Sequence, residues 1–165
     1  MRVFAVSGYS GTGKTTLVES IVTRLSDEGF TIATAKSSKH DYEDQEGTDS
    51  YRHVQAGAKI TILLGPNSSV VHHRARKKIS ALVRRTDADF LIIEGMKESE
   101  IPKVWCVGGS KITPEDLNES IKAIISWFEK SVDKDETPPV LKSTDIDGIV
   151  KIIKRDAINL QQLSI

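Results

Sequence analysis

The stretch Gly8-Tyr9-Ser10-Gly11-Thr12-Gly13-Lys14-Thr15 decides the fold that we expect for this chain. It matches the pattern G-x-x-x-x-G-K-T of a phosphate-binding loop. Glycines let the backbone curl so that successive N–H groups point at phosphate oxygens, and the following helix adds its positive N-terminal end. The sequence therefore predicts a site for a nucleoside triphosphate.

Most residues of this stretch have an expected role toward the ligand. Lys14 would reach the β- and γ-phosphates and take part in catalysis. The Thr15 hydroxyl would bind Mg²⁺, which takes only one or two protein oxygens besides the phosphates. The residues that we expect to bind the nucleotide are Gly8, Tyr9, Ser10, Gly11, Thr12, Gly13, Lys14, Thr15 and Thr16.

The flanking sequence places the loop between a strand and a helix. Arg2 to Ser7 is a short apolar run, and apolar residues recur at helical spacing from Leu17 to Leu25 until Gly29. Phe30 to Ala35 then predicts a second strand that ends at Lys36. Because ligands of open α/β sheets bind beyond the carboxyl ends of the strands, we expect Lys36 to face the same crevice as the loop.

The segment from Ser37 to Thr48 is too polar to pack and too long for a simple turn. It either moves over a bound ligand, with Asp41 inside it, or forms a solvated connection. Asp49 also has two interpretations. In the first, Asp49 or Thr48 caps a helix that runs through Tyr51 to Ala56. In the second, the Asp49 carboxylate positions Mg²⁺ or water.

Two short apolar runs, Lys59 to Leu64 and Ser69 to His72, flank the turn formers Gly65-Pro66-Asn67. We expect an antiparallel hairpin or a bent strand pair near residues 59–73. An amphipathic helix with a basic side is expected over Arg74 to Arg85. Its basic side is either a solvated face or, as in a kinase lid, the source of an arginine that contacts phosphate.

Phe90-Leu91-Ile92-Ile93-Glu94-Gly95 is typical of a buried parallel strand that ends in an acid. Glu94 lies at the end where ligands bind, so we expect it to act in catalysis and to hold Mg²⁺, directly or through water. Phosphate-loop proteins usually carry an aspartate at the position of Glu94, so the sequence leaves open whether the protein hydrolyses its nucleotide.

The last third predicts one more strand and two helices. Pro102 to Val107 reads as a strand that contains a buried Cys106. Thr113 to Lys130 reads as a capped helix with Leu117, Ile121, Ile124, Ile125 and Phe128 on one face. A charged linker then leads to a helix that Asp145 caps.

Length and composition bound the class of protein. At 165 residues we expect a single nucleotide-binding domain over 1–165. The order of the expected strands and helices predicts an α/β fold with a mostly parallel sheet flanked by helices and a helical C-terminal segment at about 113–165. A formal charge of zero disfavours nonspecific nucleic-acid binding. One cysteine and no long apolar run indicate a soluble, cytoplasmic protein that does not bind membranes.

Over its first two-thirds the chain resembles the MobB family of P-loop proteins, which assist molybdenum-cofactor biosynthesis. Besides the loop, the stretches that carry the likeness are Lys36 to Asp41, Gly47 to His53 with Ala56-Gly57-Ala58, and Ile93 to Lys97 leading to Ile101-Pro102-Lys103. The resemblance implies a dimeric GTP-binding protein with weak Mg²⁺-dependent GTPase activity. It would assist the guanylyltransferase that joins a guanine nucleotide to molybdopterin.

Under this resemblance Lys36, Asp41, Asp49 and Lys97 become candidate contacts to pterin or phosphate. The chain has Lys36-Ser37-Ser38-Lys39-His40-Asp41 where family members often carry Lys-His-x-His-His-Asp, so Ser37 and Lys39 replace two histidines. The expectation that the ligand is GTP rests on the resemblance alone, because the chain has no N-K-x-D motif for reading the base. The residues are also compatible with ATP as the ligand. Two other functions stay open, a small-molecule kinase and a nucleotide-switched interaction module.

Overall fold

A computed structural model describes residues 1–84, 86–108, 117–127 and 138–163. Contacts between residues divide the chain into two compact units, the first made of residues 1–37 and 86–164 and the second of residues 38–85. A division by contacts does not test independent folding, so the expectation of one domain stays a prediction.

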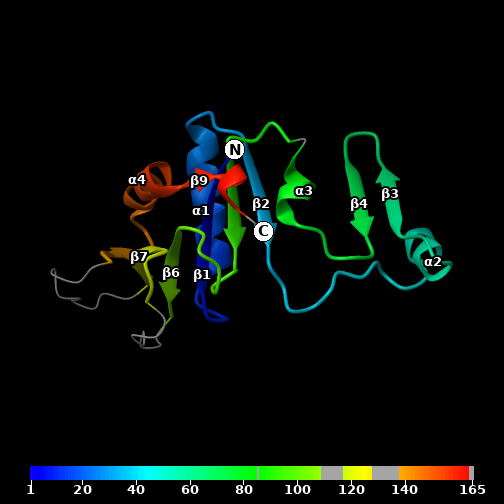
Figure 1. Ribbon diagram of the computed structural model, residues 1–165, viewed down its shortest axis with the longest axis horizontal. Helices are drawn as coiled ribbons and strands as arrows, with labels where there is room; N and C mark the ends of the chain where they lie inside the picture. Colours follow the sequence, from blue (N-terminus) through cyan, green and yellow to red (C-terminus); the bar gives the residue numbers. More distant parts are fainter. Residues whose placement is uncertain (85, 109–116, 128–137, 164–165) are drawn as a thin grey trace. The chain divides into compact units, whose positions relative to one another are not determined.

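The first unit is built on one sheet (Figure 1). Its strands run in the order β2-β5-β1-β6-β7-β8, and every neighbouring pair in this order is parallel. The short strand β9 pairs antiparallel with β1. The mostly parallel α/β fold expected from the sequence is therefore confirmed. The strand bounds are β1 Arg2–Gly8, β2 Ile32–Lys36, β5 Phe90–Glu94, β6 Lys103–Val107, β7 Ile121–Ser126, β8 Val140–Lys142 and β9 Ile158–Asn159.

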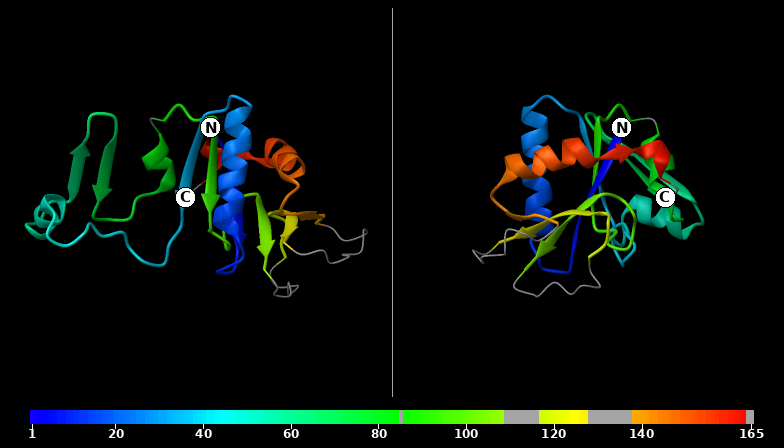
Figure 2. Two further views of the ribbon diagram at one scale, coloured as in Figure 1. Left: turned by 180° about the vertical axis from the view of Figure 1, so that it is seen from behind. Right: turned by 60° about the vertical axis from the view of Figure 1, so that its left-hand side comes forward.

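Two helices, α1 (Lys14–Asp27) and α4 (Ile146–Asp156), cover one face of this sheet (Figure 2). The apolar stripe of α1 is buried against alternate residues of the central strands, such as Phe4 and Ile92. Arg24 of α1 and Asp147 of α4 lie 2.8 Å apart, which adds a polar tie between the helices. A short 3₁₀ helix, Leu160–Gln162, follows β9.

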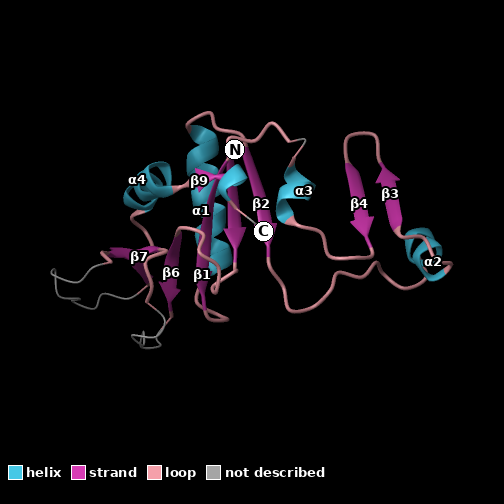
Figure 3. Ribbon diagram, viewed as in Figure 1, coloured by secondary structure: helices cyan, strands magenta, loops and turns pink. Residues whose placement is uncertain are grey.

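The second unit holds α2 (Asp49–Gln55), the hairpin β3 (Ile60–Leu64) and β4 (Ser69–His73), and α3 (Ile79–Val83) (Figure 3). Strands β3 and β4 are antiparallel, with Ile62 opposite Val71. The expected hairpin is therefore confirmed. The side chain of Thr48 accepts a hydrogen bond from the Tyr51 amide, so Thr48 and not Asp49 caps α2.

Two helix predictions were wrong. Ile121, Ile124 and Ile125 belong to strand β7, while residues 109–116 and 128–137, which include Phe128, lie outside the described residues. A strand covered on both faces is apolar at nearly every position, so it also contains helical spacings. The expected basic helix over Arg74 to Arg85 is only the five residues of α3, and Arg74 to Lys78 precede its first turn.

Candidate functional site: the phosphate loop and its surroundings

The loop between β1 and α1 has the backbone that its sequence predicts. Gly11 and Gly13 have φ values of +75° and +77°, a region that residues with a Cβ rarely adopt. Gly13 is the N-cap of α1, and no described side chain caps that helix end. The first-turn amides of α1 therefore lack a side-chain acceptor, which suits an anion at this position.

Hydrogen bonds within the loop and close packing against the end of β6 hold the loop in place. Thr12 is buried and donates a hydrogen bond of 2.9 Å to the Tyr9 carbonyl. Lys14 Nζ donates to the same carbonyl at 2.5 Å. A Cβ on Gly8 would lie 2.4 Å from the Cys106 carbonyl of β6, so only glycine fits this position without a shift of backbone. Thr15 and Thr16 are exposed at the start of α1, where a phosphate can reach them.

Glu94 lies where the sequence predicted it, at the carboxyl end of β5. Its Oε1 accepts a hydrogen bond of 3.0 Å from the Thr15 hydroxyl and lies 3.1 Å from the Lys36 ammonium. The register explains this convergence, because Lys36 of β2 is the direct neighbour of Glu94 in the sheet. The structure thus brings together three residues that are far apart in the sequence, with 79 positions between Thr15 and Glu94.

These residues fit a magnesium site. Thr15 and Glu94 present a hydroxyl and a carboxylate oxygen within hydrogen-bonding distance, and both are hard oxygen donors of the kind that Mg²⁺ takes. Within the described ranges no group of three or more His, Cys, Asp or Glu side chains is arranged to hold a metal. A site of two protein oxygens completed by phosphates needs no such group.

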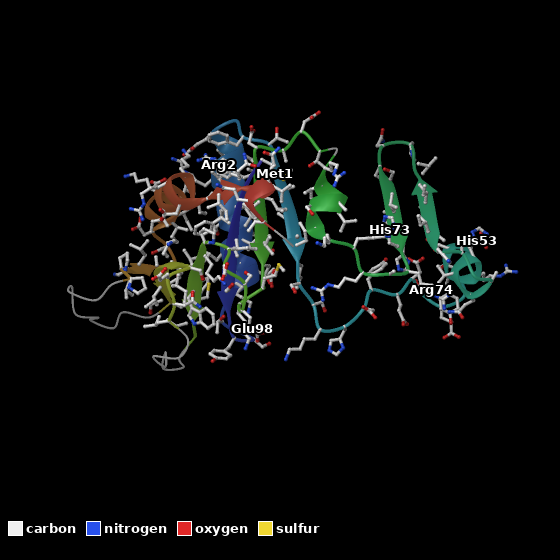
Figure 4. All side chains as sticks on the ribbon, in the orientation of Figure 1. Met1, Arg2, His53, His73, Arg74 and Glu98 are labelled. Atoms are coloured by element: carbon white, nitrogen blue, oxygen red, sulfur yellow. The ribbon has the colours of Figure 1, made fainter. Side chains whose placement is uncertain are left out.

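Lys97 lies on the loop that follows β5. Its ammonium is 5.3 Å from the centre of the Tyr9 ring, so it stands beside the phosphate loop as the candidate contact would. Met96 before it has a φ of +52°, which is rare for a residue with a side chain. Glu98 follows in the same loop and is exposed at that end of the sheet (Figure 4).

The sequence places Lys103 only in a strand and in a stretch that resembles the family, whereas in the structure it holds this loop in place. It is fully buried, and its Nζ donates to the carbonyls of Met96, Lys97 and Ser99. Burial lowers the pKa of Lys103 from 10.5 to about 8. A lysine at the start of an otherwise apolar strand is the signal that could have identified this role.

Trp127 is the second residue whose role sequence reasoning missed. It follows the last residue of β7, and its Nε1 donates a hydrogen bond of 2.8 Å to the Thr12 carbonyl. Its ring lies against Gly13, where an added Cβ would be 2.4 Å from two ring carbons. Because the segment before it was read as a helix, nothing in the sequence placed Trp127 at the phosphate loop.

The remaining two candidates lie in the second unit. Asp41 is exposed in the segment before α2, and Asp49 in the first turn of α2 pairs with Arg52 at 3.7 Å. Their contact to pterin or phosphate stays a prediction. Cys106 is an ordinary buried residue as expected, since burial raises the pKa of its thiol to about 12. In the part of the chain that the structure describes, no helix is long and apolar enough to cross a membrane.

Comparison with known proteins agrees with the resemblance. The model of the family "Molybdopterin guanine dinucleotide synthesis protein B", or MobB, matches residues 3–127. A Methanocaldococcus jannaschii protein, named as a molybdopterin-guanine dinucleotide biosynthesis adapter protein, is 42% identical over 150 residues. That alignment covers 80% of this chain but only 63% of the relative's length. A Haemophilus influenzae adapter protein of the same kind is 28% identical over 139 residues, which are 80% of this chain and 78% of that protein.

Solved structures agree on the fold. The crystal structure of Bacillus subtilis MobB superimposes with a TM-score of 0.74 at 24% identity, over 92% of this chain and 98% of that one. A MobB homologue from Bacillus stearothermophilus gives a TM-score of 0.68 at 26% identity, over 94% and 97% of the two chains. With the family model matching most of its length, the chain belongs to the MobB family.

Proposed function

We propose that this protein is a GTP-binding adapter of molybdenum-cofactor biosynthesis that helps a guanylyltransferase attach a guanine nucleotide to molybdopterin. The observation that supports nucleotide binding most strongly is the convergence of Thr15, Glu94 and Lys36 beside the glycine-rich loop. The pathway comes from the names of relatives in the family. GTP in preference to ATP rests on the resemblance.

The residues of the chain have distinct tasks in this proposal. The loop amides and Lys14 bind the β- and γ-phosphates, and Lys14 is drawn off the Tyr9 carbonyl when phosphate arrives. Thr15 and Glu94 hold Mg²⁺, which neutralises phosphate charge when bound. We expect hydrolysis to be slow, because the carboxylate that would orient water is also engaged by Thr15 and Lys36.

The partners belong to the same proposal. Lys97 is exposed beside the loop and is a candidate contact to pterin or phosphate. A second copy of the chain would cover the hairpin, where Ile60, Ile62 and Val71 lie exposed on one face. A lone two-stranded hairpin is marginally stable in water, so burial of this face by a second subunit would stabilise it. Location in the cytoplasm stays a prediction.

The direct test measures affinity by calorimetry for GTP and ATP, each with and without Mg²⁺, in the wild type and in Lys14→Ala. We expect measurable binding to the wild type and a loss of about 100-fold or more in the variant, because the lysine contacts two phosphates. Equal affinity in the two proteins would exclude the loop as the binding site. Capture of the purified guanylyltransferase with and without a nonhydrolysable GTP analogue then tests the adapter role.

The kinase alternative has lost one of its two grounds, the basic lid helix, while the fold still suits many phosphoryl transfers. Helix α3 begins only at Ile79, so the basic residues Arg74 to Lys78 do not form the expected helical lid. The switch alternative concerns the segment from Lys36 to Asp49, which runs from the end of β2 to the start of α2. Its test is protease protection of that segment with diphosphate and with triphosphate bound, and equal protection would count against a switch.

A further inference from the structure

The strand order gives the triphosphate a direction across the loop. The oxygens that suit Mg²⁺, on Thr15 and Glu94, lie on the β5 side of β1. Thr15 and Glu94 would hold an Mg²⁺ that offsets the charge of the terminal phosphates, so the terminal phosphate belongs on that side. The α-phosphate and the nucleoside must then leave the loop on the other side, toward the carboxyl ends of β6 and β7.

Trp127 stands on that other side. It directly follows β7, and β7 is separated from β1 by a single strand, β6. Its Nε1 bond to Thr12 and the contact of its ring with Gly13 fix the indole beside the phosphate loop. The residue is nevertheless 37% exposed, so part of the indole is open to solvent. A large aromatic ring that is held in place and open on one side can stack a nucleobase.

Tyr9 is the other exposed aromatic residue of the loop, and it is less suited to this task. The Lys97 ammonium lies over its ring at 5.3 Å. The ring of Trp105 meets it edge to face, with the centroids 5.8 Å apart. Tyr9 thus already has two ring contacts, whereas the Nε1 hydrogen bond and the ring contact of Trp127 are with the loop backbone.

We propose that Trp127 is the stacking platform for the purine base of the bound nucleotide. The proposal rests on nucleotide binding at the loop and adds the residue that holds the base. Stacking does not distinguish guanine from adenine, because every base has a π-face. Trp127 should therefore strengthen the binding of GTP and ATP alike, and any preference between them must come from other residues.

The test separates base contact from loop support by using a ligand that has no base. Affinities for GTP, ATP and inorganic tripolyphosphate, each with Mg²⁺, are measured by calorimetry in the wild type, Trp127→Leu and Trp127→Phe. In Trp127→Leu we expect both nucleotides to lose about 10-fold relative to tripolyphosphate, because a stacked base is worth about 1–3 kcal/mol. Trp127→Phe keeps a ring but loses the donor to Thr12. It should weaken all three ligands by one common factor and leave their ratio nearly unchanged.

Fluorescence gives a second readout. In a Trp105→Phe background Trp127 is the one remaining tryptophan of the sequence. GTP should quench its emission, whereas tripolyphosphate should leave it nearly constant. Equal quenching by both ligands, or an equal loss of nucleotide and tripolyphosphate affinity in Trp127→Leu, would overturn the platform. Failure of the wild type to bind any of the three ligands would instead overturn the proposed function.

Discussion

The Thr15 hydroxyl donates a hydrogen bond of 3.0 Å to Oε1 of Glu94, which joins the first turn of α1 to the carboxyl end of β5. The two residues are 79 positions apart in the sequence. Parallel pairing of β1 with β5 makes the contact, since Val6 near the end of β1 is the sheet neighbour of Glu94. This relationship places a hydroxyl and a carboxylate side by side at the glycine-rich loop, where the two could hold a metal.

Replacing Glu94 should weaken Mg²⁺ binding more than nucleotide binding. For Glu94→Gln we expect the Mg²⁺ concentration at half-maximal GTP binding to rise about 10-fold to 100-fold, because the neutral amide is a poorer ligand and a poorer partner for bound water. Glu98→Gln is the matched control, an exposed carboxylate in the loop that follows the same strand (Figure 4). An unchanged magnesium requirement in Glu94→Gln would remove this residue from the metal site.

Lys36 should favour triphosphate over diphosphate. The Lys36 ammonium lies 3.1 Å from the Glu94 carboxylate, and with Glu94 holding a metal ion it would be free to contact the terminal phosphate. We expect Lys36→Met to lower GTP affinity about 10-fold and GDP affinity little, and Lys36→Arg to retain most of the difference. Calorimetry with GTP and with GDP measures the two affinities in each variant. A parallel loss for both nucleotides would instead indicate a general charge effect.

The glycines of the loop should differ in their tolerance of alanine. Gly11→Ala meets no atom within 4 Å, so its cost is the strain of a positive φ, about 1 kcal/mol of unfolding free energy. Gly13→Ala adds a collision with the Trp127 ring and should cost about 1–3 kcal/mol more. Urea unfolding measures both.

The collision can be tested separately by combining Gly13→Ala with Trp127→Leu. The smaller side chain should recover part of the lost stability, which a double-mutant cycle detects as coupling between the two positions. Additive losses would show that the Trp127 ring does not restrict Gly13.

Lys103 should make stability depend on pH in the alkaline range. Its pKa is about 8 in the folded protein, below the ordinary 10.5, so between these values the unfolded chain binds more protons. The free energy of unfolding should therefore rise with pH from 8 to 10.5. Relative to Lys103→Met the wild type should gain up to about 3 kcal/mol across this window. Urea unfolding at several pH values measures it.

Lys151→Met, which removes an exposed lysine of α4, is the control for this experiment. It should follow the wild type at every pH. If Lys103→Met also followed the wild type, the buried ammonium would not be the source of the pH dependence.

The hairpin should carry the contact between two copies of the chain. Ile62→Lys places a charge in the exposed apolar face of β3 and should shift the protein from dimer to monomer in analytical ultracentrifugation. Lys77→Glu, outside the hairpin, should leave the dimer intact. A wild type that sediments as a monomer at all concentrations would contradict the proposed dimer.

The sequence by itself determined the phosphate loop and the central strands, because their signals are local. Glycines at fixed spacing, the apolar run that ends in Glu94 and the turn between β3 and β4 each depend on neighbours along the chain. The same local reading failed at β7. An apolar segment of a buried strand satisfies helical spacing as well, and only its pairing with β6 and β8 decides between the two.

Only the tertiary structure decided what surrounds the loop. Lys36 and Thr15 meet at Glu94 because parallel strands end at one edge of the sheet. Trp127 reaches Gly13 because β7 is parallel to β6 and ends on the same side. Lys103 is buried under three carbonyls because its loop folds back over the start of β6. These contacts join residues that are distant in the chain. Local sequence patterns place Lys36 and Glu94 at the ligand-binding edge of the sheet but do not say which side chains meet there, whereas the loop consists of consecutive residues.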